Sequence, residues 1–319
     1  MSNDARGKSR IGVIDMARSL ALAAMAVYHF TWDLEFFGHV TRGLTLEPGW
    51  KLFARCIASS FLILAGVSLV LAHQQAIRWK PFGLRFAMVA GAALVITVAT
   101  WFMFPDAFIY FGILHQIALA SLLGLAFLRL PWPVTAAIAA TVIALPFFWR
   151  SETFAHPALL WTGLAPVPRH SNDYVPLFPW FGAFLAGMAL AKLWLAHAPQ
   201  AWRERLTSVH LPGWLTWPGR HSLAVYLVHQ PLLIGLVWAW TQLFPPSMTI
   251  AEAEPACLSQ CLESRDDAFC RAYCTCLLDA LDAKGILFPV MSGNANEEQI
   301  RQTVEERDIC LAGQSQEGR

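Results

Sequence analysis

Three histidines that lie within apolar segments are the side chains of this chain best suited to chemistry. His29, His115 and His229 each lie inside a run of apolar residues, and Asp33 follows His29 by one helical turn. Ionisable groups are costly inside a membrane, so each of these side chains is a candidate functional residue. A carboxylate one turn from an imidazole can fix its tautomer and raise its basicity, which a general base requires. A hydrogen bond to a neighbouring helix explains any single histidine, whereas the whole set predicts a buried polar cavity.

The residues around His229 and His115 indicate how these two side chains are placed. Pro231 has no N–H, so the carbonyl of Leu227 is left free beside His229. Tyr226 shares a helix face with His229 at the i, i+3 spacing. His115 is predicted to lie seven residues into its helix, and therefore roughly 10 Å from the end of that helix.

An ion pair is also predicted within the first apolar segment. Asp15 and Arg18 are spaced i, i+3, so they can pair with each other and reach towards the membrane surface. A role for Arg18 in binding an anion explains the same pattern equally well.

The composition of the chain is that of a membrane protein. Of its 319 residues 56% are hydrophobic and 14% are charged, whereas about 25% are charged in typical globular proteins. Residues 1–244 hold 17 Lys+Arg and 9 Asp+Glu, a net charge of +8, and residues 245–319 hold 6 and 13, a net charge of −7. We therefore expect a membrane domain over residues 1–244 and an acidic, Cys-rich tail over residues 245–319. The positive charges form no basic stripe, so nucleic acid is not an expected partner.

Seven apolar stretches are long enough to be membrane-spanning helices, because about 20 residues cross the hydrocarbon core. They cover approximately residues 11–31, 52–72, 84–104, 108–129, 132–149, 175–195 and 222–244. The expected fold is all-α, a polytopic membrane helix bundle with a small helical tail. Residues 158–167 are too short to span and are expected to be re-entrant or interfacial.

The positions of Lys and Arg predict the orientation of these spans. With the N-terminus in the cytoplasm, eleven of these residues lie in inner segments and five in outer segments, as the positive-inside rule requires. The five outer residues are Arg42, Lys51, Arg55, Arg150 and Arg169. No small-x-small cleavage site follows the basic N-terminus, so we expect an uncleaved first helix. Seven spans then place the tail outside, and we expect the membrane to be a bacterial inner membrane and the tail to be periplasmic.

Six of the seven cysteines lie in the tail, at positions 257, 261, 270, 274, 276 and 310. An even number in a short acidic segment is typical of disulfides in an oxidising compartment. The spacing places each C-x3-C pair on one helix face, and a helical hairpin would join Cys257 to Cys274 and Cys261 to Cys270. Cys276 is then left for Cys310. This pairing is a hypothesis, since six cysteines allow 15 connectivities, and a zinc site is the competing interpretation, although the tail contains no histidine.

Several segments of residues 1–244 together resemble a bacterial membrane family that is similar to the catalytic domain of heparan-alpha-glucosaminide N-acetyltransferase. These segments follow one another from residue 10 to about residue 235. They are RIGVIDMAR at 10–18, YHFTWDL at 28–34, FLILAGVS at 61–68, FGILH at 111–115, DYVPLFPWFG at 173–182, and GRHS at 219–222 with HQP at 229–231.

The resemblance implies transmembrane acetylation, in which acetyl-CoA binds from the cytoplasmic side and an amino-sugar amine on the far side accepts the acetyl group. The family enzyme uses a histidine in the first outer loop, to which His39 is nearest here. The family carries an asparagine where this chain has His29, so the resemblance leaves open which histidine acts and whether the acceptor is an amino sugar. The Cys-rich tail lies outside the resemblance.

An N- or O-acetyltransferase that uses acetyl-CoA as co-substrate needs three kinds of group. The amine or hydroxyl needs a base or a nucleophile, for which His29 or His39 with Asp33 is suited. The thioester oxygen needs hydrogen-bond donors, which His115, Tyr226 or His229 would provide. The CoA phosphates need cations, for which the inner-face candidates are Arg18, Arg78, Lys80, Arg85 and Arg220. The positive-inside rule alone also explains these cations.

Two functions of other classes also fit the pattern. The histidines could relay protons in a proton-coupled transporter or carrier, or the tail could dock a partner while the bundle serves as an envelope interaction scaffold. No metal-ligand spacing occurs in residues 1–244, so we expect no metal. The expected partners are membrane lipid and a small-molecule or glycan acceptor, and a homo-oligomer is compatible with the sequence.

Overall fold

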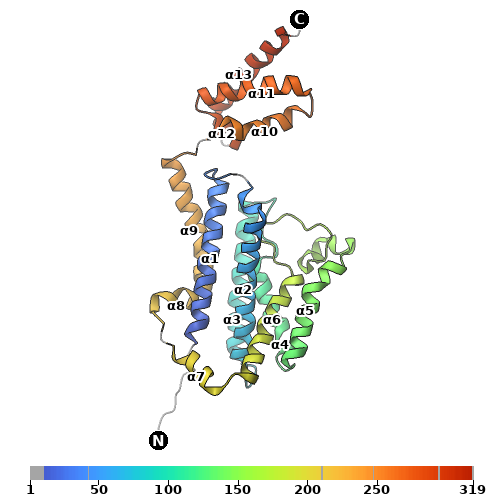
Figure 1. The fold of residues 1–319 in the computed structure, drawn as a ribbon, viewed down its shortest axis with the longest axis vertical. Coiled ribbons are helices and arrows are strands. Elements are labelled where there is room, and N and C mark those ends of the chain that lie inside the picture. The colour runs from blue at the N-terminus through green and yellow to red at the C-terminus, as the bar shows by residue number, and fades with distance from the viewer. Residues whose placement is uncertain (1–10, 42, 210, 247, 294, 318–319) are drawn as a thin grey trace. The chain divides into compact units, whose positions relative to one another are not determined.

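The protein is all-α, as predicted (Figure 1). The computed structural model describes residues 11–41, 43–209, 211–246, 248–293 and 295–317. Within these ranges it contains no β-strand and one isolated bridge, between Phe111 and Tyr174. The α-helices are α1 Gly12–Phe36, α2 Pro48–Ala72, α3 Trp79–Met103, α4 Ile113–Phe127, α5 Trp132–Phe148, α6 Leu177–His197, α7 Gln200–Ser208, α8 Gly213–Arg220, α9 Ser222–Leu243, α10 Ile250–Cys261, α11 Asp267–Ala283, α12 Leu287–Ser292 and α13 Glu297–Glu317. Three short 3₁₀ helices are η1 Leu44–Leu46, η2 Glu152–Ala155 and η3 Pro157–Thr162.

Each of the seven predicted spans is a helix. Among the described residues five helices, α1, α2, α3, α6 and α9, are long and apolar enough to cross a membrane, so the chain is a membrane protein. The helices α4 and α5 are shorter, with 15 and 17 residues. Helix α4 was expected to begin near residue 108 but begins at Ile113. Pro105 disfavours helical backbone at Phe104, where α3 has just ended, and Gly112 caps α4 with extended backbone.

The segment over residues 158–167 was expected to be too short to span, and it consists largely of the 3₁₀ helix η3 and the turn after it. The hydroxyl of Tyr174 donates to the carbonyl of Leu160, at 2.6 Å. This bond ties η3 to the segment that leads into α6.

Contacts divide the chain into two compact units. The first, which we call the bundle unit, contains the described residues of Met1–His29 and Glu47–Leu232. The second, the tail unit, contains those of Phe30–Leu46 and Leu233–Arg319. The domain boundary at residue 244 remains a prediction from composition.

Helix α6 lies at the centre of the bundle unit, packed against α2 and α5 (Figure 1). Its side chains Phe184, Leu185 and Met188 are fully buried, together with Leu62 of α2. Two glycines allow this close packing, since a Cβ on Gly66 would meet the carbonyl of Phe184, and a Cβ on Gly187 would meet the backbone of Ile63. Small residues at such crossings are typical of helices that pack inside a membrane, where close backbone approach provides the association energy.

We expect Gly187→Ala to destabilise the bundle unit by about 1–3 kcal/mol, because the added methyl group pushes α2 away from α6. Gly91→Ala on α3 is the matched control, since a Cβ there has no atom within 4 Å, and alanine is the better helix former. Thermal unfolding in detergent, followed by tryptophan fluorescence, measures both. A midpoint for Gly187→Ala at or above that of Gly91→Ala would contradict this account of the packing.

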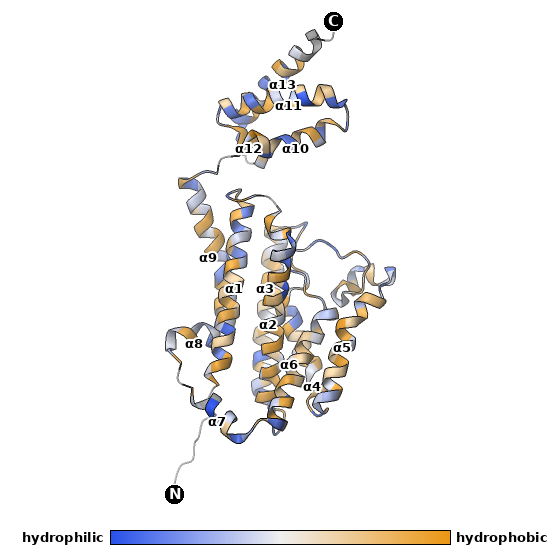
Figure 2. Ribbon diagram, viewed as in Figure 1, coloured by the Kyte–Doolittle hydropathy of each residue, from blue (hydrophilic) through white to orange (hydrophobic). Residues whose placement is uncertain are grey.

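The outer surface of the bundle unit is apolar. Helix α3 shows this most clearly, since only Ala92 and Ala93 are buried along its 25 residues, while Leu84, Val95 and Val98 are exposed. Figure 2 shows apolar residues along the bundle helices and more hydrophilic residues in α10–α13. A large exposed apolar surface of this kind is what lipid tails would cover.

Three disulfides hold the tail unit together, and their pairing is the one predicted. Cys257 is bonded to Cys274, Cys261 to Cys270 and Cys276 to Cys310. The first two join the antiparallel helices α10 and α11, and the third joins α11 to α13. Because all six cysteines are consumed, the alternative of a zinc site formed by them is wrong.

Removal of the third disulfide is expected to release α13. The double substitution Cys276→Ala and Cys310→Ala opens a link with a sequence separation of 34 residues, which stabilises by roughly 2–4 kcal/mol. Limited proteolysis of the full chain in detergent should then cleave α13 faster than in the wild type. Cys56→Ala is the control, because Cys56 is a free, exposed cysteine. Equal cleavage of the double variant and the wild type would show that packing alone holds α13.

Candidate functional site

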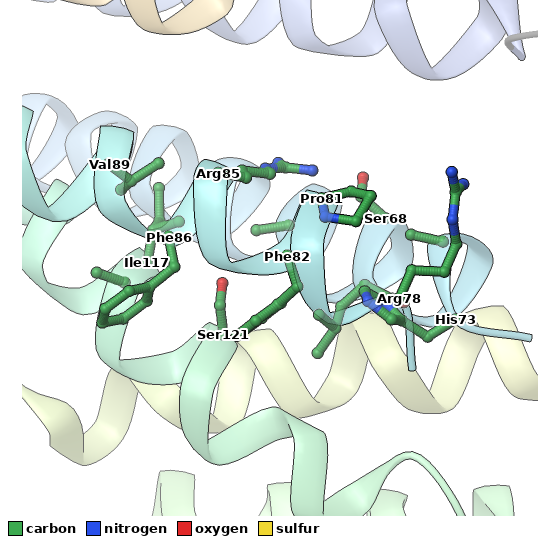
Figure 3. Close-up of a pocket in the computed structure, with 14 residues that line it drawn as sticks. Ser68, His73, Arg78, Pro81, Phe82, Arg85, Phe86, Val89, Ile117 and Ser121 are labelled. Atoms are coloured by element: carbon green, nitrogen blue, oxygen red, sulfur yellow. Dashed lines mark hydrogen bonds between the residues drawn. The ribbon is translucent and has the colours of Figure 1, made fainter. Parts of the chain in front are cut away.

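A first pocket lies between the second half of α2, the start of α3 and the middle of α4, and we call it the Arg85 pocket (Figure 3). Its volume is about 170 Å³, and its polar lining residues are Ser68, His73, Arg78, Arg85 and Ser121. Arg78 and Arg85 are seven residues apart and are both exposed. Figure 3 shows their guanidinium groups on the same side of α3. Neither forms a salt bridge with any described residue, so both can bind an anion.

A second group of cations, Arg18 and Arg220, is connected to the Arg85 pocket by a hydrogen bond to Ser68, one of its lining residues. The guanidinium of Arg18 donates to the hydroxyl of Ser68 at 2.6 Å and to the carboxylate of Asp15 at 3.2 Å. The Nε of Arg220 lies 3.5 Å from the second oxygen of Asp15. The predicted Asp15–Arg18 pair is therefore present, and one carboxylate serves two arginines.

Helix α8 packs against α1 at Asp15 and Ser19. The N–H of Gly219 donates to the hydroxyl of Ser19 at 2.9 Å, and a Cβ on Gly219 would collide with the carbonyl of Asp15. This close approach places Arg220 beside Asp15. The phosphate-binding candidates Arg18, Arg78, Arg85 and Arg220 thus all lie at or near one end of the bundle unit.

A pair of histidines from α1 and α9 forms the second part of the candidate site. The rings of His29 and His229 meet edge to face, with 5.0 Å between their centroids. The Nδ1 of His229 lies 2.6 Å from the carbonyl oxygen of Tyr226. A carbonyl can only accept, so Nδ1 carries the proton, and Nε2 of the neutral ring is left as the acceptor. This Nε2 is buried and has no hydrogen-bond partner among the described residues, which is the arrangement that a general base requires.

The histidine pair lies towards the start of α2. Tyr28, which precedes His29, packs edge-on against that histidine, with 5.7 Å between the ring centroids, and in a tilted arrangement against Trp50 at the start of α2, at 6.2 Å. The Arg85 pocket begins further along α2, at Ala65. The base candidate and the candidate phosphate site are thus separated along the bundle axis.

His115 lies nearer to the start of its helix than predicted. It was expected seven residues into its helix but is the third residue of α4, because that helix begins at Ile113. Its Nδ1 accepts from the N–H of Gly112 at 3.2 Å, and its Nε2 lies 3.1 Å from the hydroxyl of Thr97. Both ring nitrogens are therefore engaged, which suits a residue that caps α4 and positions its neighbours.

His39 and Asp33 belong to the tail unit. The Nε2 of His39 lies 2.8 Å from the hydroxyl oxygen of Thr241, and that hydroxyl donates to the carbonyl of Val237. Nε2 must therefore donate, so Nδ1 of the neutral His39 ring carries the lone pair. Asp33 is fully buried. Their predicted catalytic roles remain predictions.

Asp173 and Gln116 are polar residues of the site that the sequence reasoning did not select. Asp173 precedes α6, and its Oδ2 accepts from the N–H of Ile113 at the start of α4, at 2.8 Å. Gln116 is fully buried, and neither atom of its amide group has a partner among the described residues. The signal for Asp173 was present in the DYVPLFPWFG segment, but a carboxylate in a loop is usually a solvated one.

A second pocket contains Asp173, and we call it the Asp173 pocket. Its volume is about 440 Å³, and it lies between the first half of α2, the end of α5 and the segment that leads into α6. Arg55, Arg150, Tyr174 and Trp180 also line it. Because the Arg85 pocket is formed by the other end of α2, the bundle unit has a pocket towards each end.

Burial raises the pKa of the Asp173 carboxyl from 3.8 to about 6. Since this folded-state pKa lies above the ordinary value, the free energy of unfolding falls as the pH rises from about 4 to about 6 and stays lower above it. Asp173→Asn keeps an acceptor for Ile113 and carries no charge. We expect this variant to exceed the wild type in stability at pH 8 by on the order of 2 kcal/mol, and to match it at pH 4. Unfolding midpoints of the variant and the wild type at pH 4 and pH 8 test this prediction. The same difference between the two proteins at both pH values would contradict it.

One family model matches the chain. The model of a family described as heparan-alpha-glucosaminide N-acetyltransferase, catalytic, matches residues 10–231. No similar protein of curated function and no similar solved structure is found. The match covers the Arg85 pocket, the histidine pair and the Asp173 pocket, and it ends at Pro231, before the tail helices α10–α13.

Proposed function

Because the chain belongs to the heparan-alpha-glucosaminide N-acetyltransferase catalytic family, we propose that it is a membrane acetyltransferase that moves an acetyl group from acetyl-CoA to an amino sugar. The observation that carries this proposal is the pair of pockets towards the two ends of α2. Their nearest lining residues on that helix are Ala65 and Ala58, about 10 Å apart along the axis. A donor and an acceptor bound in these pockets approach each other inside the bundle.

The Arg85 pocket is proposed to bind the phosphates of acetyl-CoA. Arg78 and Arg85 have no carboxylate partner among the described residues, and arginine is well suited to phosphate because its donors form a fixed fork. The lining between the two arginines is apolar, with Phe82, Phe86 and Val89. The thioester arm of CoA would extend from here towards the histidine pair.

In the proposed reaction His229 is the base. The acceptor nitrogen attacks the thioester carbonyl, the carbon–sulfur bond breaks, and CoA leaves as a thiolate, which takes from the base the proton that the amine loses. The proton of the acceptor amine passes to Nε2 of His229, whose Nδ1–H is held by the Tyr226 carbonyl. His29 lies beside this ring and would stabilise it or share the proton. His39, the residue nearest to the family's histidine, is the alternative base.

The orientation is proposed from the charge pattern. With eleven cations on the inner segments and five on the outer ones, the Arg85 pocket faces the cytoplasm, where acetyl-CoA is available, and the Asp173 pocket faces outward. The disulfide-bonded tail would then lie in an oxidising compartment such as the periplasm.

The test is release of CoA from acetyl-CoA by the purified protein in detergent, with and without glucosamine. We expect release that depends on the acceptor and is lost in His29→Ala or in His39→Ala, and the inactive variant identifies a histidine that the reaction requires. Absence of release, together with absence of acetyl-CoA binding, would refute the acetyltransferase and favour proton-coupled transport.

A further inference from the structure

The Asp173 pocket has a positive lining. Two of its side chains are the arginines Arg55, on α2, and Arg150, just after α5. Both are exposed, and neither forms a salt bridge with a described residue. The Nε of Arg150 donates to the carbonyl of Pro146 at 3.0 Å, which fixes the side chain and leaves its terminal nitrogens for a ligand. Two unpaired guanidinium groups at one pocket favour a ligand that carries an acidic group.

These arginines also run against the charge pattern of the chain. They belong to the five cations that the positive-inside rule assigns to the outer segments, where cations are scarce. The positive-inside rule therefore does not explain why Arg55 and Arg150 are arginines.

The start of α6 adds to the same preference. The backbone at Phe178 is not helical, so the regular helix begins at Pro179, which lines the pocket together with Phe178 and Trp180. The N-terminus of a helix carries a partial positive charge and binds anions. The rings of Phe178, Trp180 and Tyr174 offer flat apolar surfaces, which suit the apolar face of a sugar ring.

A single carboxylate, that of Asp173, lies in this positive lining. Its Oδ2 accepts from Ile113, and its other oxygen can accept from an amine. The pocket thus presents one acceptor for an amino group and two cations for an acid.

We propose that the Asp173 pocket binds an amino sugar that also carries an acidic group, with the amine at Asp173 and the acid at Arg55 and Arg150. The acid is a phosphate, a sulfate or a carboxylate. This inference narrows the acceptor class of the proposed acetyltransferase and rests on that function for its place in the reaction, but the binding itself does not require transfer. A lipid headgroup offers the same phosphate chemistry to arginines at helix ends, so the test has to separate the two sources.

The experiment compares binding of glucosamine and glucosamine 6-phosphate to the full-length protein by isothermal titration calorimetry, in a maltoside detergent without phosphate and without acetyl-CoA. We expect the phosphorylated sugar to bind at least about tenfold more tightly, as one charge-assisted hydrogen bond provides. Arg55→Gln and Arg150→Gln should each reduce this preference, and the double variant should abolish it. Arg169→Gln is the matched control, because Arg169 is also an outer-segment arginine but stacks on Phe108 outside the pocket lining.

Equal affinities for the two sugars in the wild type, or a preference that survives in the double variant, would overturn the inference. A third outcome would also overturn it: short-chain phosphatidic acid binds through Arg55 and Arg150, while the protein shows no preference between the two sugars. The arginines would then bind a lipid headgroup. Acetyl transfer in the same preparation separates this inference from the proposed function. If both sugars bind equally and are acetylated equally well, the inference about the acidic group is overturned and the acetyltransferase is supported. If the phosphorylated sugar binds selectively but neither sugar is acetylated, the inference is supported and the acetyltransferase is overturned.

Discussion

His229→Ala is expected to lower the rate of acetyl transfer by about 10²–10⁴-fold, the usual contribution of a general base. The Nε2 of His229 is buried without a partner in the described part of the chain, and its Nδ1 is held by the carbonyl of Tyr226. The Nδ1 atoms of His73 and His221 are also held by backbone carbonyls, but among the described histidines of the bundle unit His229 alone has a buried Nε2 without a partner. The rate is measured as CoA release at saturating acetyl-CoA and acceptor.

His229→Asn separates the base from the packing. The amide nitrogen of asparagine takes the place of Nδ1 and can still donate to Tyr226, but the side chain has no basic atom. We expect it to be as inactive as alanine while unfolding at the wild-type temperature. His197→Ala is the control, since His197 is an exposed residue at the end of α6. Activity of His229→Asn within a few-fold of wild type would show that His229 positions its neighbours, and would leave His29 or His39 as the base.

The helices could be predicted because their signal is local. Each of the seven spans was visible as an apolar run, and the spacing of Cys257, Cys261, Cys270 and Cys274 suggested a helical hairpin whose hypothetical pairing the disulfides confirm. The start of α4 could not be predicted from hydropathy. Phe108, Ile109 and Phe111 are as apolar as the helix they precede, but the backbone of Ile109 is bonded to the hydroxyls of Thr97 and Thr100, and the carbonyl of Phe111 accepts from the N–H of Val175.

The site was only partly predictable, for a different physical reason. The histidines are visible in the sequence because they interrupt apolar runs, but their hydrogen bonds are not. His115 and His229 look alike in sequence, yet His115 has both nitrogens engaged with Thr97 and Gly112, while Nε2 of His229 has no partner in the described part of the chain. Tertiary neighbours decide which imidazole can act as a base, and those neighbours lie on other helices.

The surroundings of the arginines could not be predicted from the sequence either. Arg18 and Arg220 were grouped with Arg85 because all three lie near the predicted inner surface, but Asp15 neutralises part of their charge. Arg55 and Arg150 are 95 residues apart in the chain, and only the folding of α2 against the segment between α5 and α6 brings them to one pocket. A property that arises from long-range contact has no signature in a single sequence.

The second large effect is expected at the Arg85 pocket. The double substitution Arg78→Gln and Arg85→Gln should raise the KM for acetyl-CoA by about a hundredfold, because each arginine contributes roughly 1.5–3 kcal/mol in a hydrogen bond to a charged group. The kcat should change little, since the phosphates are equally bound in the ground state and in the transition state. Arg129→Gln is the control, as Arg129 is an exposed arginine between α4 and α5 that does not line the pocket.

S-acetyl-pantetheine, which lacks every phosphate of CoA, makes this prediction specific. The wild type should prefer acetyl-CoA in kcat/KM, and the double variant should lose that preference while it uses S-acetyl-pantetheine as well as the wild type does. A variant that loses both substrates alike would have a disrupted fold at the start of α3. A variant that keeps the full preference would show that the phosphates bind elsewhere, and Arg18 and Arg220 would then be the next residues to substitute, because they lie beside Ser68 and Asp15.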